Sequence, residues 1–327
     1  WMEGAFPNCP GLHQKANLLG YEYFNALFDY GQDLNGCPVP PEDVIDSIVG
    51  GSADNYAALR SAWGDKIEKL DSVADCCSDS VCGGTPCNMS TLPVHFDGKP
   101  WAATSGSFAV ATYFATFFLM EALNGHPTFA QGKLSLDEVV QLFSVNSGGL
   151  EQMDNAFTAK SWGSTLLGYV LASFDQTAVA SPIPGLLHGP ETEVVLLAGH
   201  DTNVMLMSKL LDMPYLLDGW FLRSTHPGIM LIFELHREST EDGDVDTVQA
   251  FWQSASPQQM RDVATFTEEA PPVRHPAFIP GCGSAASPER CLLGDFGRLV
   301  RQLVDPECIT ISEIQRYILG GDAVIVV

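Results

Sequence analysis

The sequence is poor in basic residues, and this shortage argues against two classes of partner. It contains 16 Lys and Arg residues against 40 Asp and Glu residues, so its 327 residues carry a formal net charge of −24. Proteins that bind nucleic acids neutralise phosphates with clustered cations, and anionic membrane surfaces attract the same side chains. We therefore expect neither a nucleic acid nor a membrane as a partner.

Long hydrophobic runs are also lacking. The longest apolar stretch, residues 108–123, is interrupted by Thr112, Tyr113 and Thr116. It is shorter than the roughly 20 apolar residues that span a bilayer, and we interpret it as a buried helix. The sequence shows no internal repeats and no low-complexity tract. A chain of this length has enough residues for a large core and two lobes.

The nine cysteines lack the spacing of a structural zinc site, because they form no C-x-x-C blocks with suitably spaced histidines. They cluster in loops rich in Ser, Gly and Asp, which predicts disulfides and a secreted protein or another oxidising compartment. The segment Asn88-Met89-Ser90 is a glycosylation sequon and agrees with secretion. The odd number of cysteines leaves one thiol over, and we expect it to be Cys9.

Hydrophobic periodicity divides the chain into a helical lobe followed by part of an α/β lobe. The pattern changes after the loop at 181–190, where predicted strands begin to alternate with helices. Ser135 and Glu138 have the spacing of a capping box and should open a helix. A hairpin turn is expected at 241–244. The predicted helices are 15–30, 41–49, 52–73, 104–124, 135–146, 150–173, 204–211, 292–303 and one that starts at 257, and the predicted strands are 194–198, 228–235 and 245–252.

The stretch VVLLAGHDTNVMLM (194–207) places His200 and Asp201 on the turn between a predicted strand and a predicted helix. One interpretation is purely structural, because Asp and Asn favour strand ends and cap helices. The other is functional, because ligands gather at the carboxyl ends of strands in α/β sheets and a helix N-terminus favours phosphate. An imidazole there can hydrogen-bond a phosphoryl oxygen, and a carboxylic acid can protonate a leaving alcohol. The local pattern leaves both interpretations open.

The segment AGHDTN resembles the second signature of the histidine acid phosphatases, in the His-Asp-Thr-Asn form of the phytase and glucose-1-phosphatase type. Three further segments are similar to the C-terminal part of that family. They are HPGIMLIFEL (226–235), SPQQMRD (256–262) and IPGCGSAASPERCLLGDFGRLV (279–300). The resemblance is good over 190–310, is looser over 35–175 and does not extend to 1–35.

This resemblance implies an α/β fold class, with a histidine-phosphatase-like α/β sheet lobe that is incomplete at its N-terminus and a mainly helical lobe. Residues 1–37 would be a remnant of the α/β lobe. Residues 38–175 would form the mainly helical lobe, and residues 176–327 would form the C-terminal part of the α/β lobe.

The implied activity is the hydrolysis of phosphate monoesters, such as phytate or sugar phosphates, in two steps through a phosphohistidine. In this chain Asp201 would donate a proton to the leaving group, and His200 would contact the phosphoryl oxygens. Thr202 and Asn203 would shape the same turn and contact the substrate. The family also places a cationic residue ahead of the helix near 165, for which Lys160 is the candidate. The mechanism needs no metal and no organic cofactor.

The resemblance further implies two disulfides, Cys282–Cys291 and Cys37–Cys308. The four cysteines between residues 76 and 87 could form one or two more bridges, and the sequence leaves their connectivity open. His226, which precedes the Pro-Gly turn of the matched segment, is a further candidate to face the site.

The sequence departs from the family where the nucleophile belongs. The motif Arg-His-Gly-x-Arg-x-Pro is absent, since Arg60 is the first arginine and Arg223 is the next. In the family this motif belongs to the first strand of the sheet, N-terminal to every segment matched here. A leaving-group acid alone contributes about 10²–10⁴-fold, so we expect negligible phosphatase activity from this chain by itself. The predicted strand 194–198 would also lose its neighbours, and we interpret the chain, which begins at Trp1 without a signal peptide, as a fragment.

Three hypotheses follow. We favour a secreted acid phosphatase that acts on a small-molecule phosphate monoester and whose N-terminal part is absent from this chain. The second hypothesis is a catalytically inactive relative that binds anionic ligands or a protein partner. The third is an unrelated secreted α/β protein in which the His-Asp pair only caps a helix.

Overall fold

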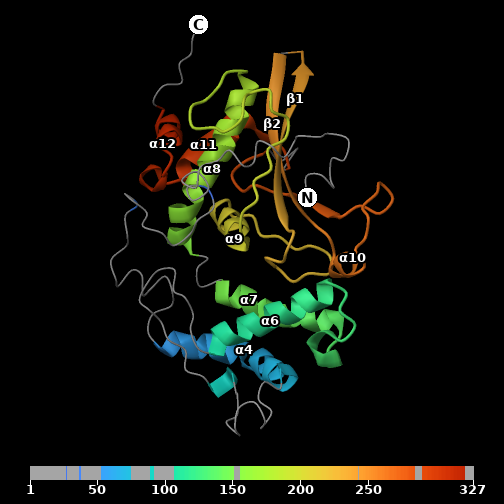
Figure 1. Ribbon diagram of the computed structural model, residues 1–327. Helices are drawn as coiled ribbons and strands as arrows, with labels where there is room; N and C mark the ends of the chain where they lie inside the picture. Colours follow the sequence, from blue (N-terminus) through green and yellow to red (C-terminus); the bar gives the residue numbers. More distant parts are fainter. Residues whose placement is uncertain are drawn as a thin grey trace.

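The computed structural model describes Leu27, Cys37 and residues 53–74, 89–91, 107–150, 155–241, 243–283 and 289–320. These residues form a helical lobe, drawn at the bottom of Figure 1, and an α/β lobe above it. The helical lobe contains α4 (Ala53–Ala74), η2 (Met89–Thr91), α6 (Ser107–Leu123), η3 (Phe129–Gly132) and α7 (Leu136–Leu150). The α/β lobe contains α8 (Ala156–Ala178), α9 (Asp201–Leu210), β1 (Met230–Thr240), β2 (Gly243–Ser254), α10 (Pro257–Arg261), β3 (Val273–Ala277), β4 (Cys291–Leu292), α11 (Leu293–Leu303), η4 (Pro306–Cys308) and α12 (Ser312–Ile318).

The apolar stretch near 108–123 is helix α6, as predicted. Small and apolar side chains at helical spacing bury one stripe of α6 completely, namely Ala111, Ala115, Leu119 and Ala122. The opposite face is exposed and carries Tyr113, which is 76% exposed. This one-sided burial fixes α6 against α4 and α7 in the helical lobe.

Two helix ends of this lobe, the start of α7 and the end of α4, have satisfied backbone groups. The Ser135 hydroxyl accepts a hydrogen bond from the Glu138 N–H at 3.3 Å, and the Glu138 carboxylate accepts one from the Ser135 N–H at 2.8 Å. This reciprocal pair is the predicted capping box, which is confirmed. At the end of α4, Gln131 donates to the Ala74 carbonyl at 2.9 Å and Lys133 donates to the carbonyls of the last turn.

Strands β1 and β2 form a long antiparallel hairpin. Their register pairs Met230 with Gln253 and Thr240 with Gly243, and β3 and β4 both pair with β2. The predicted strands 228–235 and 245–252 and the turn between them are confirmed, although both strands are longer than predicted. The tip of the hairpin is exposed and charged, with the Arg237 Nε 2.7 Å from the Asp246 carboxylate.

Helix α8 packs against the other helices of the α/β lobe, although the sequence-based division at residue 175 assigns it to the helical lobe. Glycines permit two of these close contacts. A Cβ atom added at Gly163 would lie 3.2 Å from Leu210 of α9, and one added at Gly168 would lie 3.1 Å from Ile314 of α12. The Phe174 ring of the same helix lies 6.3 Å from the Phe296 ring of α11.

One predicted strand is wrong. Residues 192–200 form no regular secondary structure, although the sequence predicts a strand at 194–198. Val194, Val195 and Leu196 are 69%, 41% and 47% exposed. A strand requires a hydrogen-bonded neighbour, and none of the described strands pairs with this segment.

Some predictions concern residues that the structure does not describe, and some short elements are not predicted. The predicted helices 15–30 and 41–49 lie outside the described residues except for Leu27, which is helical. Cys9, the cysteines between 76 and 87 and Asn88 of the sequon also lie outside. The sequence does not predict β3, β4 or α12. Strand β3 contains Pro276, which disguises a strand because proline cannot donate to the ladder.

Two further searches concern only the described ranges. No helix within them is long and apolar enough to cross a bilayer. Within the same ranges, no group of three His, Cys, Asp or Glu side chains has an arrangement that could hold a metal ion.

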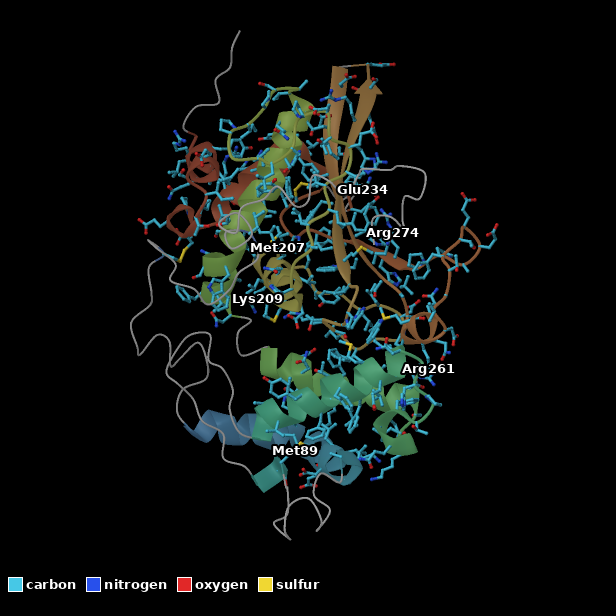
Figure 2. All side chains as sticks on the ribbon, viewed as in Figure 1. Met89, Met207, Lys209, Glu234, Arg261 and Arg274 are labelled. Atoms are coloured by element: carbon cyan, nitrogen blue, oxygen red, sulfur yellow. A yellow bond between two sulfur atoms is a disulfide. The ribbon has the colours of Figure 1, made fainter. Side chains whose placement is uncertain are left out.

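The two lobes meet at α10 and α6. Arg261 donates to the carbonyl of Ala122 at 2.6 Å, and its guanidinium lies 4.8 Å from the Phe129 ring centroid. Figure 2 shows Arg261 at this junction. Nearby, the Phe143 ring of α7 lies 6.1 Å from the Phe221 ring of the α/β lobe. A helix-terminal hydrogen bond and aromatic packing therefore fix one lobe on the other.

We expect opposite effects from two glycine substitutions in the helical lobe. A Cβ atom at Gly148 would lie 2.6 Å from the Trp63 ring, so Gly148→Ala should lower the free energy of unfolding by about 1–3 kcal/mol. Gly64 lies in the middle of α4 with no atom within 4 Å of an added Cβ, so Gly64→Ala should raise it by about 0.5–1 kcal/mol. Urea denaturation of both variants measures the free energy of unfolding. A wild-type value for Gly148→Ala would contradict the close packing of Trp63 on Gly148.

Candidate active site

The His200-Asp201 pair lies at the N-terminus of α9. His200 is the N-cap residue, with an extended backbone at φ −103° and ψ 167°. Its backbone N–H donates to the Asn203 Oδ1 at 2.7 Å, and the Thr202 N–H donates to the Asp201 Oδ1 at 2.8 Å. The Asn203 side chain therefore supplies one hydrogen bond of a capping box. This agrees with the structural interpretation, in which polar residues of the turn cap a helix.

The same turn leaves its chemically active groups accessible. His200 and Asp201 are exposed, whereas Thr202 and Asn203 are buried. The Thr202 hydroxyl is buried, and it has no hydrogen-bond partner within the part of the chain that the structure describes. The helix N-terminus and the exposed imidazole suit an anion, and the exposed Asp201 carboxyl group beside them could donate a proton.

Lys160 is an exposed residue near the start of α8. Gly163 of α8 makes the close contact with α9. It lies against Leu206 and Leu210, toward the C-terminal end of α9. These contacts lie toward the other end of the helix from His200. The role of Lys160 as a phosphate contact stays a prediction.

His226 is a core residue. It is 1% exposed, and its ring stacks on the Trp220 ring with centroids 3.6 Å apart. Its Nδ1 lies 3.1 Å from the Ser224 hydroxyl, and its Nε2 lies 2.8 Å from the Ser254 hydroxyl. Both ring nitrogens are therefore engaged inside the lobe, and the ring anchors the loop after α9 to the end of β2.

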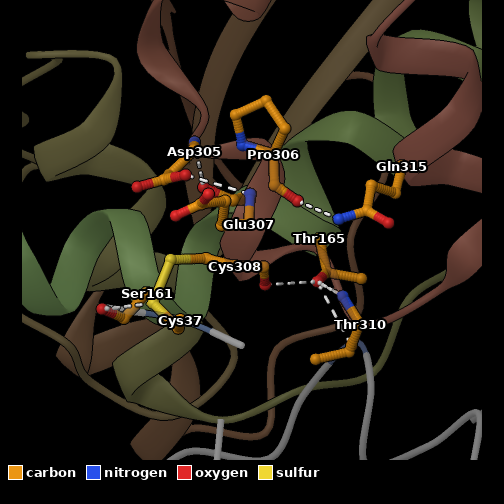
Figure 3. The surroundings of a disulfide bond; sticks show 10 residues. Cys37, Ser161, Thr165, Asp305, Pro306, Glu307, Cys308, Thr310 and Gln315 are labelled. Carbon is orange, nitrogen blue, oxygen red and sulfur yellow. Dashed lines mark hydrogen bonds between the residues drawn. A yellow bond between two sulfur atoms is a disulfide. The ribbon is translucent and has the colours of Figure 1, made fainter. Parts of the chain in front are cut away.

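The disulfide Cys37–Cys308 anchors the C-terminal segment beside the start of α8 (Figure 3). Cys37 Sγ lies 3.3 Å from the Ser161 hydroxyl. One turn further along, the Thr165 hydroxyl accepts a hydrogen bond from the Thr310 N–H at 3.0 Å. Cys282 and Cys291 form the second disulfide. These are the two pairs that the family resemblance implies, and the first of them lies beside α8, the helix against which α9 packs.

Comparison with known proteins identifies the class. No protein-family model matches the chain. The phytase AppA of Escherichia coli K12 is 24% identical over 318 residues, which cover 93% of this chain and 71% of that phytase. The apo structure of Hafnia alvei phytase matches with a TM-score of 0.73 and 23% identity, over 94% of this chain and 75% of that one. The structure of the same phytase with myo-inositol hexakis sulphate matches with a TM-score of 0.67 and 25% identity, over 82% of this chain and 65% of that one.

The fold is therefore that of the histidine phosphatases, a mixed α/β fold with a helical lobe. The relationship in sequence and the shared fold together support membership of the histidine acid phosphatase family, as the AGHDTN segment predicted. The chain spans between about two thirds and three quarters of the length of these relatives.

The buried histidine generates a prediction about acid stability. Burial lowers the pKa of His226 to about 3, because desolvation disfavours the charged ring, while a hydrogen bond to Ser224 acts in the opposite direction. The unfolded chain binds this proton near the ordinary value of 6.5, so stability should fall as the pH drops from about 6.5 toward 3. The expected slope from this residue is about 1.4 kcal/mol per pH unit.

His226→Phe keeps an aromatic ring against Trp220 but cannot titrate. The variant should be less stable than the wild type at pH 7, and its free energy of unfolding should fall less steeply between pH 6 and pH 4. Urea denaturation at several pH values measures both slopes. His126→Gln, which changes an exposed ring, serves as the control and should keep the wild-type slope. Equal slopes for the wild type and His226→Phe would show that His226 does not set the acid sensitivity.

Proposed function

We propose that this chain supplies the proton donor and one phosphate contact of an acid phosphatase that hydrolyses phosphate monoesters. The observation that carries the proposal is the AGHDTN turn, which has an exposed His200 and Asp201 at the N-terminus of α9. The phytase relatives and their shared fold support the same chemistry. In this proposal the positive end of the α9 dipole and the His200 imidazole attract the phosphoryl oxygens, and Asp201 faces the ester oxygen.

The reaction proceeds in two displacements. A histidine nucleophile attacks phosphorus, the bond between phosphorus and the ester oxygen breaks, and Asp201 transfers its proton to the departing alkoxide. Water then attacks the phosphohistidine, Asp201 takes a proton from that water, and inorganic phosphate leaves. Asp201 thus acts first as an acid and then as a base, and the proton balance closes over one cycle.

The nucleophile and its arginines belong to a segment that this sequence does not contain. No Arg-His-Gly occurs in it. The exposed apolar residues Val194, Val195 and Leu196 support a missing neighbour, because a run of this kind is normally buried in a sheet. We propose that an upstream strand with Arg-His-Gly-x-Arg-x-Pro pairs beside this segment and brings the nucleophile to His200 and Asp201.

The substrate proposed is a small phosphate ester such as phytate or a sugar phosphate. One of the similar structures holds myo-inositol hexakis sulphate, a polyanion with tetrahedral groups. Thr202, Asn203 and Lys160 are proposed to contact the substrate. The two disulfides agree with the proposed secretion into an oxidising compartment, as does the proposed glycosylation at Asn88.

An inactive relative that binds anionic ligands or a protein partner is the second candidate. The observation that favours it is the absence of the nucleophile motif together with an intact anion-binding turn. The coding sequence upstream of Trp1 distinguishes the two candidates. An in-frame Arg-His-Gly-x-Arg-x-Pro supports the enzyme, and a signal peptide cleaved just before Trp1 supports the inactive binder.

We expect activity only in the completed protein. The chain alone should release no phosphate from p-nitrophenyl phosphate above background, whereas the chain joined to its upstream segment should release it at acidic pH. In the completed protein Asp201→Asn should lower kcat by about 10²–10⁴-fold, because the leaving group loses its proton donor.

Asp212→Asn provides the matched control for this test. Asp212 is exposed just beyond the other end of α9, and its φ of 50° is a conformation that Asn accepts. This variant should keep full activity. Equal activities for Asp201→Asn and the wild type would remove Asp201 from the mechanism.

A further inference from the structure

A second polar cluster lies in the helical lobe, between α4 and α7. Lys66 Nζ donates to the Ser144 hydroxyl and lies 4.6 Å from the centroid of the Trp63 ring. Ser147 follows Ser144 by about one helical turn, so both side chains lie on the same side of α7. Ser144 and Ser147 are 5% and 7% exposed, whereas Lys66 is half-buried and reaches solvent. The cluster therefore has a buried floor and one accessible side.

Lys66 is a half-buried cation with no carboxylate partner among the described residues. Burial lowers the pKa of its ammonium, because desolvation disfavours the charged form. An ammonium that is withdrawn from water without an anion is costly. Lys69, one turn further along α4, differs because its ammonium lies 4.0 Å from the Glu138 carboxylate and its side chain is 48% exposed.

Lys66 and Ser147 keep hydrogen-bond donors that the described hydrogen bonds do not use. The Ser144 hydroxyl accepts from Lys66 and donates to the Gln141 carbonyl, so its single donor is used and it holds the ammonium in place. Two of the three Lys66 N–H donors remain. The Ser147 hydroxyl is buried and has no hydrogen-bond partner within the residues that the structure describes. The unused donors are those of one cation and one neutral hydroxyl, and together they suit an anion with several acceptor oxygens.

We propose that Lys66 and Ser147 bind one tetrahedral oxyanion, the phosphoryl group of inorganic phosphate or of a phosphate ester, while Ser144 positions the Lys66 ammonium. The Trp63 ring closes one side of this site, because it packs directly on Gly148 in the next position of α7. The site lies in the other lobe from His200 and Asp201. The inference stands whether or not the completed protein is a phosphatase.

Lysine footprinting of the full chain tests the site without any substitution. The chain is acetylated with acetic anhydride, and mass spectrometry measures the rate at each lysine with and without inorganic phosphate, with KCl balancing the ionic strength. Phosphate at millimolar concentration should slow acetylation of Lys66 at least about fivefold and leave Lys69 unchanged. Equal effects on both lysines, or none on either, would overturn the proposal.

Variants then test the assigned donors. Ser147→Ala keeps the ammonium, removes the unpartnered hydroxyl and should weaken phosphate protection of Lys66 about tenfold, as expected for a hydrogen bond to a charged group. The matched control Lys69→Met should leave that protection intact. If phosphate protects Lys66 as strongly in Ser147→Ala as in the wild type, Ser147 is not a ligand and the proposal fails. Because both measurements are made on Lys66 itself, binding at His200 does not affect them.

A second ligand distinguishes the two sources of the phosphoryl group. Protection by inorganic phosphate alone assigns the site to free phosphate. Equal protection by glycerol phosphate assigns it to a phosphoryl group that is attached to a substrate.

Discussion

The close contact of α8 with its neighbours is the constraint on which the α/β lobe depends. Gly163 and Gly168 bring this helix directly against Leu210 and Ile314, so α9 and α12 are both fixed by a single central helix. Gly163 holds α9 toward its C-terminal end, and at its other end His200 and Asp201 are exposed while Thr202 and Asn203 are buried. The candidate site is therefore a consequence of how the opposite end of the helix is packed.

The elements that the sequence predicts well are those whose signals are local. Two apolar segments and the charged turn between them predict the β1–β2 hairpin, and the Ser135–Glu138 spacing predicts the start of α7. The segment 194–198 has an equally strong apolar signal, yet it is not a strand, because a strand needs a partner and none of the described strands pairs with it. Strand β3 has the partner but not the signal, since Pro276 interrupts its pattern.

The distinction between local and non-local signals also applies to the two sites, the His200-Asp201 turn and the cluster around Lys66. The His200-Asp201 turn is contiguous, so its motif is visible in six residues of the sequence, although the strand predicted before it is wrong. The cluster of Lys66 and Ser144 joins residues 78 positions apart, and neither residue belongs to a recognisable motif. Only the packing of α4 on α7 shows that Lys66 lies against the buried Ser144 hydroxyl. His226 lies in a matched segment, but only the fold reveals that its ring is enclosed.

The hairpin also governs how this chain behaves in solution. Its outer strand β1 forms the edge of the described sheet, and most of the charges that discourage edge-to-edge pairing lie in the half beyond His236. The half with Leu231, Phe233 and Leu235 is apolar and half-exposed. Repulsion between molecules of net charge −24 keeps such edges apart at low ionic strength. Added salt screens that repulsion over a few ångströms, so colloidal stability of the isolated chain depends on the salt concentration of its buffer.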